Sequence, residues 1–377
     1  MAEPGAPERI ASLDAVRGLA GFAVAIAHYL AYRSIGPLYA EAASALAVEV
    51  FFTLSGFVLA PQIIRCVRDG SLSTLRVFLM RRWMRTVPPY LVALAAVAIL
   101  VGQTTLSDTV RYALYVQNLF AQHNSVDYFP VAWSLSVEEW FYVTFPALAM
   151  AAAVLARRAD RGVVAVAAIA YIAAVSLYRH GAGDLAHWGF EVRRVVAFRV
   201  DSIAYGVLLY LALSSVARRE RAGAAAGAAG IAAVAAGALG LYAALRIGVD
   251  NSDAAKQVFP YVASVFGMSA ICFAFYLSRA VDRVGPVREL AYFGGRISYP
   301  VYLFHLPLMM VLPDWTAGLP AAVEFATYLV VLTLFCAVFH AVFEKPILAA
   351  RPRYARARNE AETPGAEPAP ALTMGRV

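Results

Sequence analysis

Long apolar stretches alternate with short, arginine-rich polar segments along almost the whole chain. A helix that crosses a bilayer needs about 20 mostly apolar residues, because only its own hydrogen bonds satisfy its backbone there. About ten stretches meet this requirement. They cover roughly residues 15–32, 43–64, 87–102, 131–154, 163–178, 195–214, 224–245, 257–278, 298–313 and 321–343. The pattern predicts an all-α polytopic membrane protein with about ten transmembrane helices.

Composition supports this prediction. Of 377 residues, 61% are apolar and only 15% are charged, and the mean hydropathy is +0.64. Soluble domains usually carry about 25% charged residues, so a soluble enzyme and a disordered chain are both excluded. The cysteines Cys66, Cys272 and Cys336 show no CxxC spacing, so we expect neither a disulfide framework nor a metal site.

Lysine and arginine are distributed unevenly between the apolar stretches. The two terminal segments and every second loop together hold 24 of the 32 cations. The positive-inside rule therefore places the N- and C-termini in the cytoplasm, in a multi-pass protein of the cell membrane. The net charge of +7 is then mostly a topology signal, and it does not require nucleic-acid binding.

The same pattern divides the chain into three parts. We expect a short cytoplasmic segment over 1–10, a transmembrane domain over 11–345 and a disordered cytoplasmic tail over 346–377. Ala25 and Ala27 resemble a signal-peptide cleavage site. Glu3 and Glu8 precede the first apolar stretch, so we expect an uncleaved helix instead.

Ionisable side chains inside the predicted spans are costly, so each one is a functional candidate. They are Arg17, His28, Glu49, Glu138, Glu139 and His305. Arg17 and His28 share one helix face and lie about 16 Å apart along its axis. Helix rise places His28, Glu49 and Glu138 in one layer, which His305 could complete. A carboxylate beside an imidazole fixes its tautomer and raises its basicity, which suits a general base.

Structural roles are also open to these residues. Arg17 could extend to the inner boundary and pair with Asp14 one turn earlier. His28 could be a neutral histidine that is hydrogen-bonded to a neighbouring helix. A proton-coupled membrane transporter would use His28 and Glu138 equally well, so position alone does not identify an enzyme.

Two further motifs bear on ligand binding. Ser55 and Gly56 lie together in the second span, where a glycine lets a thin ligand pass or a helix pack closely. Arg81, Arg82 and Arg85 lie within about one helical turn, so their guanidinium groups could converge on a phosphate-bearing ligand. Anionic lipid headgroups are the alternative ligand of this arginine cluster.

Five motifs resemble those of one family and follow the same order. They are Ser12–Ala20 followed by His28, Phe52–Phe57, Arg81–Pro88, Trp133–Tyr142 and Ser298–His305. Over about residues 10–345, the chain resembles the acyltransferase-3 family of integral-membrane O-acyltransferases.

The resemblance implies an enzyme that moves an acyl group, most often acetyl, from acyl-CoA to a hydroxyl group. The implied acceptor is a carbohydrate, a glycolipid or a glycosylated natural product. His28 would be the catalytic base or acyl carrier, and Glu138 its acidic partner. The implied donor-binding residues are Arg17, Ser55, Gly56, Arg82 and Arg85. The expected acceptor-side residues are Glu49, Glu139, Tyr302 and His305.

The arginine cluster favours the acyltransferase over a transporter, because a transporter has no need of a cytoplasmic phosphate cradle. A membrane scaffold without chemistry would leave Arg17, His28 and Glu138 unexplained. Some relatives carry a hydrolase-like domain after the last span, and we expect none here. Outer-loop candidates for binding acceptor hydroxyls are Gln117, Asn118, His123, Asn124 and Asp127.

Overall fold

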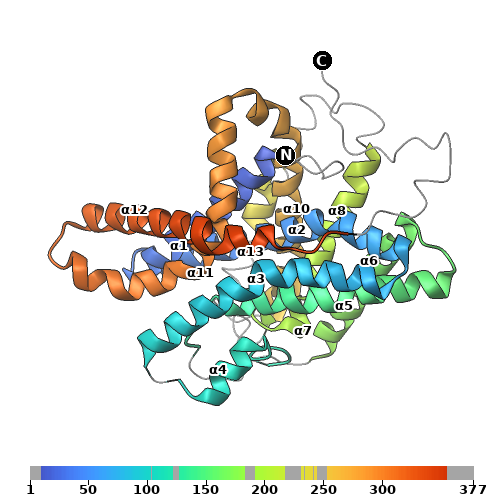
Figure 1. Ribbon diagram of the computed structural model, residues 1–377, viewed down its shortest axis with the longest axis horizontal. Helices are drawn as coiled ribbons and strands as arrows, with labels where there is room; N and C mark the ends of the chain where they lie inside the picture. Colours follow the sequence, from blue (N-terminus) through green and yellow to red (C-terminus); the bar gives the residue numbers. More distant parts are fainter. Residues whose placement is uncertain are drawn as a thin grey trace.

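A computed structural model of the chain describes residues 10–102, 104–121, 127–182, 192–216, 231–232, 234–240, 242–243 and 253–354. Every regular element in this part of the chain is helical, which confirms the predicted all-α class (Figure 1). The helices are α1 Ala11–Tyr32, α2 Pro37–Asp69, α3 Leu72–Val101, α4 Leu106–Ala113, α5 Ala132–Ala156, α6 Arg161–Gly181, α7 Val196–Arg199, α8 Ser202–Val216, α10 Asp253–Arg283, α11 Gly285–Thr316, α12 Ala321–Phe339 and α13 Lys345–Ala349. A π-helical turn, His340–Glu344, joins α12 to α13.

Eight stretches of the described helices are long and apolar enough to cross a membrane. They are Ala11–Tyr32, Ala43–Asp69, Leu72–Val101, Ala132–Ala156, Arg161–Gly181, Val196–Ser214, Val258–Ser278 and Ala321–Ala349. Each contains or overlaps one of the predicted stretches. Of the remaining two, 298–313 lies within α11, and much of 224–245 lies outside the described residues. The count of ten and the cytoplasmic termini stay predictions.

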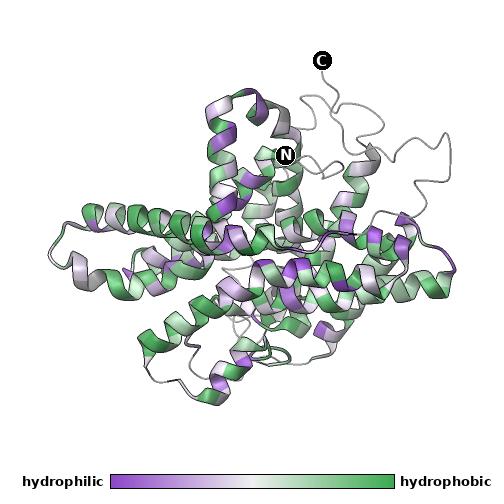
Figure 2. Ribbon diagram, viewed as in Figure 1, coloured by the Kyte–Doolittle hydropathy of each residue, from purple (hydrophilic) through white to green (hydrophobic). Residues whose placement is uncertain are grey.

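Helix α2 is the central span of the bundle. Within its most apolar window, 72% of the residues are buried inside the protein, against 17% for α12. Helices α1, α5, α8 and α10 pack around α2, and α11 packs against α1 (Figure 1). Helix α12 therefore lies at the periphery, where its exposed side chains Val330, Leu334 and Val338 suit contact with lipid. Figure 2 shows the apolar colouring along α12 and polar residues chiefly at helix ends and inside the bundle.

Small residues bring the central helices into backbone contact. A β-carbon at Gly18 would lie 2.9 Å from the backbone of Gly294, and one at Gly21 would lie 3.2 Å from the Ser298 carbonyl oxygen. These contacts advance in step along α1 and α11, so the two helices run in the same direction. Gly56 packs in the same way against the backbone of Ile203 in α8. The approach of small residues is the usual basis of helix association in lipid.

The chain after α12 departs from the prediction. A disordered tail was expected from residue 346, but α13 spans Lys345–Ala349, and Pro352 accepts a hydrogen bond from Arg81. The predicted boundary lies too early, because contacts with α3 order the chain through residue 354. Residues 1–9 and 355–377, which carry the other terminal predictions, lie outside the described residues.

Replacement of Gly56 by alanine should destabilise the bundle, because the added methyl group would overlap the Ile203 carbonyl oxygen of α8. Overpacking of this kind typically costs about 1–3 kcal/mol. We expect a lower midpoint of thermal unfolding in detergent. Gly181→Ala is the matched control, because no atom lies within 4 Å of a β-carbon there. Equal midpoints for the two variants would show that the α2–α8 contact can relax freely.

Candidate active site

A cavity of about 90 Å³ lies between α1, α2, α3, α5 and α11, within about 800 Å³ of space that includes open solvent. Aromatic and aliphatic side chains of α2, such as Phe51, Phe52 and Val58, form its apolar wall. The polar side chains in its lining are Arg17, Ser55, Arg82, Arg85, Thr86, Ser134, Glu138, Tyr142, Ser298, Tyr299 and Tyr302. An apolar cleft with a few convergent polar groups is the usual form of a ligand site.

Two hydrogen bonds fix the side chain of Glu138, which lines this cavity. The Ser55 hydroxyl donates to its Oε1 at 2.9 Å, and the Tyr142 hydroxyl donates to its Oε2 at 2.8 Å. Tyr142 lies one turn further along α5, so helical geometry alone brings this phenol to the carboxylate. Arg17 and Arg85 lie within electrostatic range of Glu138. Both carboxylate oxygens are therefore oriented before any ligand enters.

Arginine side chains gather at one end of the cavity. Arg82 and Arg85 of α3 line it beside Arg17, whose guanidinium lies 4.0 Å from Asp14. Arg82 donates to the side-chain oxygen of Gln62 at 2.7 Å. Within the described residues, neither Arg82 nor Arg85 has a carboxylate partner within 4 Å. Although Asp14 lies beside Arg17, and Glu138 lies within electrostatic range of Arg17 and Arg85, the described lining of the cavity holds three arginines and one carboxylate.

A pair of histidines adjoins the cavity at Tyr302. The Nδ1 atom of His28 lies 2.8 Å from Nε2 of His305, and the two rings stack with centroids 5.0 Å apart. On its other side, Nδ1 of His305 lies 2.8 Å from the Tyr302 carbonyl oxygen and 3.1 Å from that of Val301. His305 is fully buried, whereas His28 keeps partial exposure.

Tyr302 joins the histidine pair to the cavity wall. Its ring centroid lies 6.1 Å from that of His305, and its hydroxyl lies 2.5 Å from the Ser134 hydroxyl. The same phenol donates to the carbonyl oxygen of Val131 at 3.2 Å. His28 and His305 are not among the residues that line the cavity, and Tyr302 is the lining residue that lies next to this imidazole pair.

A family model described as an acyltransferase domain matches residues 10–341, almost the whole of the helical region. The chain belongs to the acyltransferase-3 family. The resemblance drawn from five sequence motifs is therefore confirmed. The protein is a membrane acyltransferase, and the transporter and scaffold alternatives are set aside.

Relatives of the acyltransferase match part of the chain. Protein 2 of the picA locus of Rhizobium radiobacter is 31% identical over 148 residues, which are 37% of this chain and 75% of that protein. The peptidoglycan O-acetyltransferase OatA of Listeria monocytogenes is 28% identical over 154 residues, 37% of this chain and 24% of OatA. A Staphylococcus aureus protein provisionally named an O-acetyltransferase is 28% identical over 158 residues, with the same two shares. The chain thus spans only 24% of the length of these two O-acetyltransferases. No solved structure matches the acyltransferase.

The structure brings most of the predicted donor-site residues of the acyltransferase together. Arg17, Ser55, Arg82 and Arg85 all line the cavity with Glu138. Gly56 does not appear in the lining. It packs against α8, so of its two predicted roles the close packing of helices is the one that the structure supports.

The predicted pairing of His28 with a carboxylate is wrong. Nδ1 of His28 faces His305 instead, while Glu138 binds Ser55 and Tyr142. The close approach of α1 and α11 decides this, because it brings residues 277 positions apart into hydrogen-bond range. Tertiary packing of this kind leaves no trace in the spacing along one helix.

Two predicted acidic residues lie away from the cavity. Glu49 is buried in an ion pair with Arg199, and Glu139 accepts a hydrogen bond from Thr86 at 2.5 Å. The predicted common layer of Glu49 and Glu138 is wrong as well. The α2 residue beside Glu138 is Ser55, six positions and about 9 Å further along the helix. The apolar spans of α2 and α5 begin within one residue of their predicted starts, so the offset arises from how the two helices are staggered against each other.

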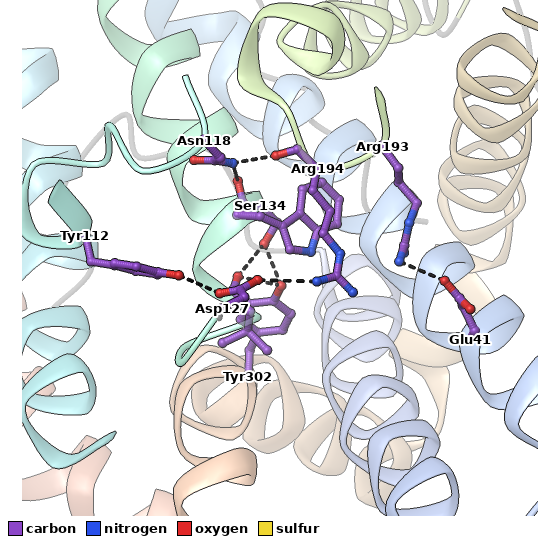
Figure 3. A network of polar contacts seen from close by, with 10 residues as sticks. Glu41, Tyr112, Asn118, Asp127, Ser134, Arg193, Arg194 and Tyr302 are labelled. Atoms are coloured by element: carbon purple, nitrogen blue, oxygen red, sulfur yellow. Dashed lines mark hydrogen bonds and ion pairs between the residues drawn. The ribbon is translucent and has the colours of Figure 1, made fainter. Parts of the chain in front are cut away.

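A further polar network lies beside the N-terminal end of α5, where Asn118 binds the Trp133 carbonyl oxygen (Figure 3). Asp127 accepts hydrogen bonds from the Tyr112 hydroxyl at 2.6 Å and from Arg194 at 3.3 Å. Arg193 pairs with Glu41 at 3.1 Å, and its burial, followed by the charge of Arg194, lowers its pKa to about 10. Neither Arg193 nor Arg194 was predicted from the sequence to be a site residue.

The predicted acceptor-binding loop residues point inward where they are described. The side chain of Gln117 donates to Ser136 at 2.8 Å. That of Asn118 donates to the carbonyl oxygens of Trp133 and Arg194. Both amides are buried and hold the loop against α5. His123 and Asn124 lie outside the described residues.

The Glu49–Arg199 pair gives a test of a structural role for Glu49. Glu49→Leu should destabilise the protein by about 3–5 kcal/mol, because it leaves the buried Arg199 without its counterion. We expect a lower unfolding midpoint in detergent. The double variant Glu49→Leu/Arg199→Leu should recover most of the loss.

Glu289→Leu serves as the control, because its side chain and that of its partner Arg288 are both exposed, a setting in which an ion pair contributes less. If Glu49→Leu kept full stability and lost acyl transfer, Glu49 would belong to the substrate site instead.

Proposed function

We propose that the protein is a membrane O-acyltransferase that moves an acyl group, acetyl in the first instance, from acyl-CoA to a hydroxyl group of a carbohydrate, a glycolipid or a glycosylated natural product. One observation carries the proposal. A single cavity is lined by Arg17, Arg82 and Arg85 and also by Tyr302, whose ring lies beside the hydrogen-bonded pair of His28 and His305. The relatives named as O-acetyltransferases support the acetyl group and the hydroxyl acceptor.

The arginine end suits the donor. Phosphate groups match the forked geometry of guanidinium and bind it with charge-assisted hydrogen bonds. Arg17, Arg82 and Arg85 would hold the phosphates, and the narrow pantetheine arm would extend along the cavity. Arg17 and His28 are separated by about 16 Å of helix, a length that an extended pantetheine arm can span. Coenzyme A is cytosolic, and the positive-inside rule assigns the arginine end to the cytoplasm.

The hydrogen bonds of the histidine pair support His28 as the catalytic base. A carbonyl oxygen only accepts, so the proton of neutral His305 is on Nδ1 and its Nε2 carries the lone pair. Nε2 of His305 then accepts from Nδ1 of His28, and the lone pair of His28 is on its own Nε2. This chain of bonds prepares one nitrogen of His28 to take a proton.

In the proposed transfer, one side chain, His28, both removes and returns the proton. Nε2 of His28 removes the acceptor hydroxyl proton as the oxygen attacks the thioester carbonyl carbon. The carbon–sulfur bond then breaks, and the imidazolium returns the proton to the departing thiolate. His305 holds the ring of His28 in the required tautomer throughout. Glu138 keeps Ser55 and Tyr142 oriented along the path of the donor arm.

The test is to incubate the purified protein or its membranes with radiolabelled acetyl-CoA and to identify the base-labile labelled product. His28→Ala should lower turnover about 100-fold or more, because a positioned general base typically contributes that much. His180→Ala, a change at an exposed histidine of α6, is the control and should leave turnover unchanged. Wild-type turnover in His28→Ala would remove His28 from the mechanism.

The donor site predicts a different kinetic signature for Arg85. Arg85→Ala should raise the KM for acetyl-CoA by roughly tenfold and change kcat little, because phosphates far from the reacting carbon give mainly uniform binding. Arg76→Ala, at an exposed position nine residues earlier on α3, is the control. If Arg85→Ala changed neither constant, the arginine cluster would be assigned to anionic lipid instead.

A further inference from the structure

The chain beyond α13 lies against α2 and α3, next to the arginines of α3. The Arg81 guanidinium donates to the Pro352 carbonyl oxygen at 2.7 Å. The Tyr354 hydroxyl donates to the side-chain oxygen of Gln62 at 3.3 Å, and the same oxygen accepts from Arg82 at 2.7 Å. Residues 350–354, which we call the C-terminal strap, therefore contact Arg81 directly and the donor-site residue Arg82 through Gln62.

The ring of Tyr354 also contacts two arginines. The guanidinium carbon of Arg65 lies 4.6 Å from the ring centroid, and that of Arg81 lies 5.4 Å from it. Contacts between a guanidinium and an aromatic face at this distance are attractive. Tyr354 thus restrains Arg65 and Arg81, and Gln62 links it to Arg82. These restraints reduce the side-chain entropy that the arginines would lose on binding a ligand.

Arg351 adds a further cation to the cluster. Its Nε donates to the Leu348 carbonyl oxygen at 3.0 Å. Burial, followed by the charges of Arg85, Arg81 and Arg82, lowers its pKa to about 10. Among the described residues, no carboxylate lies within 4 Å of the guanidinium groups of Arg81, Arg82, Arg85 or Arg351. Arg351 directly precedes Pro352, whose carbonyl oxygen binds Arg81, so its charge lies near those of the α3 arginines. Like charges placed together repel one another, and a bound polyanion would relieve this repulsion.

Elsewhere in the protein, buried arginines are paired with carboxylates. Arg199, Arg179 and Arg193 each face a carboxylate at 4 Å or less. These three buried arginines are thus neutralised within the bundle. Among the described residues, the four cations Arg81, Arg82, Arg85 and Arg351 have no carboxylate within 4 Å. The nucleotide end of coenzyme A carries a diphosphate and a ribose 3′-phosphate, which together match a cluster of this kind.

We infer that the C-terminal strap completes the donor site, with Arg351 as a phosphate-binding residue for the nucleotide end of acyl-CoA and Tyr354 as the residue that positions Arg81 and Arg82. This inference rests on the proposed function. Arg351 lies beyond the last span, so it meets the end of the donor that is furthest from the thioester. Its contribution is therefore to donor binding and to the choice between donors with and without a nucleotide.

The test compares Arg351→Ala with Arg353→Ala in the purified full-length protein. Both variants lose one positive charge from the strap, but Arg353 is exposed. Arg351→Ala should raise the Kd for coenzyme A, measured by calorimetry in neutral detergent, by roughly tenfold. It should raise the KM for acetyl-CoA by a similar factor, with kcat within about twofold of wild type and no change in KM for S-acetylpantetheine, which lacks the nucleotide. Arg353→Ala should match wild type in each measurement.

Conservative variants separate binding from folding. Arg351→Lys should restore part of the affinity, because it keeps the charge and loses the guanidinium fork. Tyr354→Phe should weaken coenzyme A binding less than Tyr354→Ala, because phenylalanine keeps the ring contact with Arg81 and loses only the bond to Gln62. Equal unfolding midpoints for all variants would show that the strap is not needed for folding.

The outcomes also separate this inference from the proposed function. A wild-type protein that binds no coenzyme A would overturn the proposed function and, with it, the donor role of the strap. Binding by wild type that Arg351→Ala leaves unchanged would overturn the inference alone. A weaker association of Arg351→Ala with phosphatidylglycerol nanodiscs, at unchanged coenzyme A affinity, would assign the cluster to a lipid headgroup and overturn the inference as well.

Discussion

The backbone contact between α1 and α11 is the feature on which the site depends. Gly18 lies against Gly294 and Gly21 against Ser298, and the absence of larger side chains lets two long helices run together in the same direction. Further along the same pair of helices this contact brings His28 to His305. It also sets Arg17 and Tyr302 on facing walls of one cavity. In lipid, such packing supplies the cohesion that the hydrophobic effect supplies in water.

Buried charges occur in two settings in this protein. Glu49 with Arg199 and Asp201 with Arg179 are neutralised inside the bundle, where an isolated charge would cost several kcal/mol. Among the described residues, Arg82 and Arg85 at the cavity have no carboxylate within 4 Å, and Arg82 is linked to the C-terminal strap through Gln62. The contrast distinguishes charges that maintain the fold from charges arranged for a ligand. A membrane enzyme that binds a polyanionic donor needs both kinds.

Much of the fold follows from composition, because a bilayer admits few architectures. The helical class and most span positions follow from runs of apolar residues in the sequence. The same holds for parts of the site: Tyr142 lies one turn from Glu138, and Arg82 and Arg85 lie within one turn of each other. The partner of His28 does not follow, since His305 is 277 residues away. Neither does the separation of Glu49 from Glu138, which depends on how α2 and α5 are staggered when they pack and on which helices surround them.

The sequence by itself determined that this chain is a helical membrane protein and that its motifs are those of an acyltransferase. It also determined which ionisable side chains lie within the predicted membrane spans. Those properties depend on residue type and on spacing along one chain, and both can be seen in the sequence. Only the tertiary structure decided that His28 faces a histidine, that Glu49 serves an ion pair, and that the segment after the last helix reaches the arginine cluster. These outcomes depend on how closely helices approach and on which faces meet, and packing between distant segments sets both.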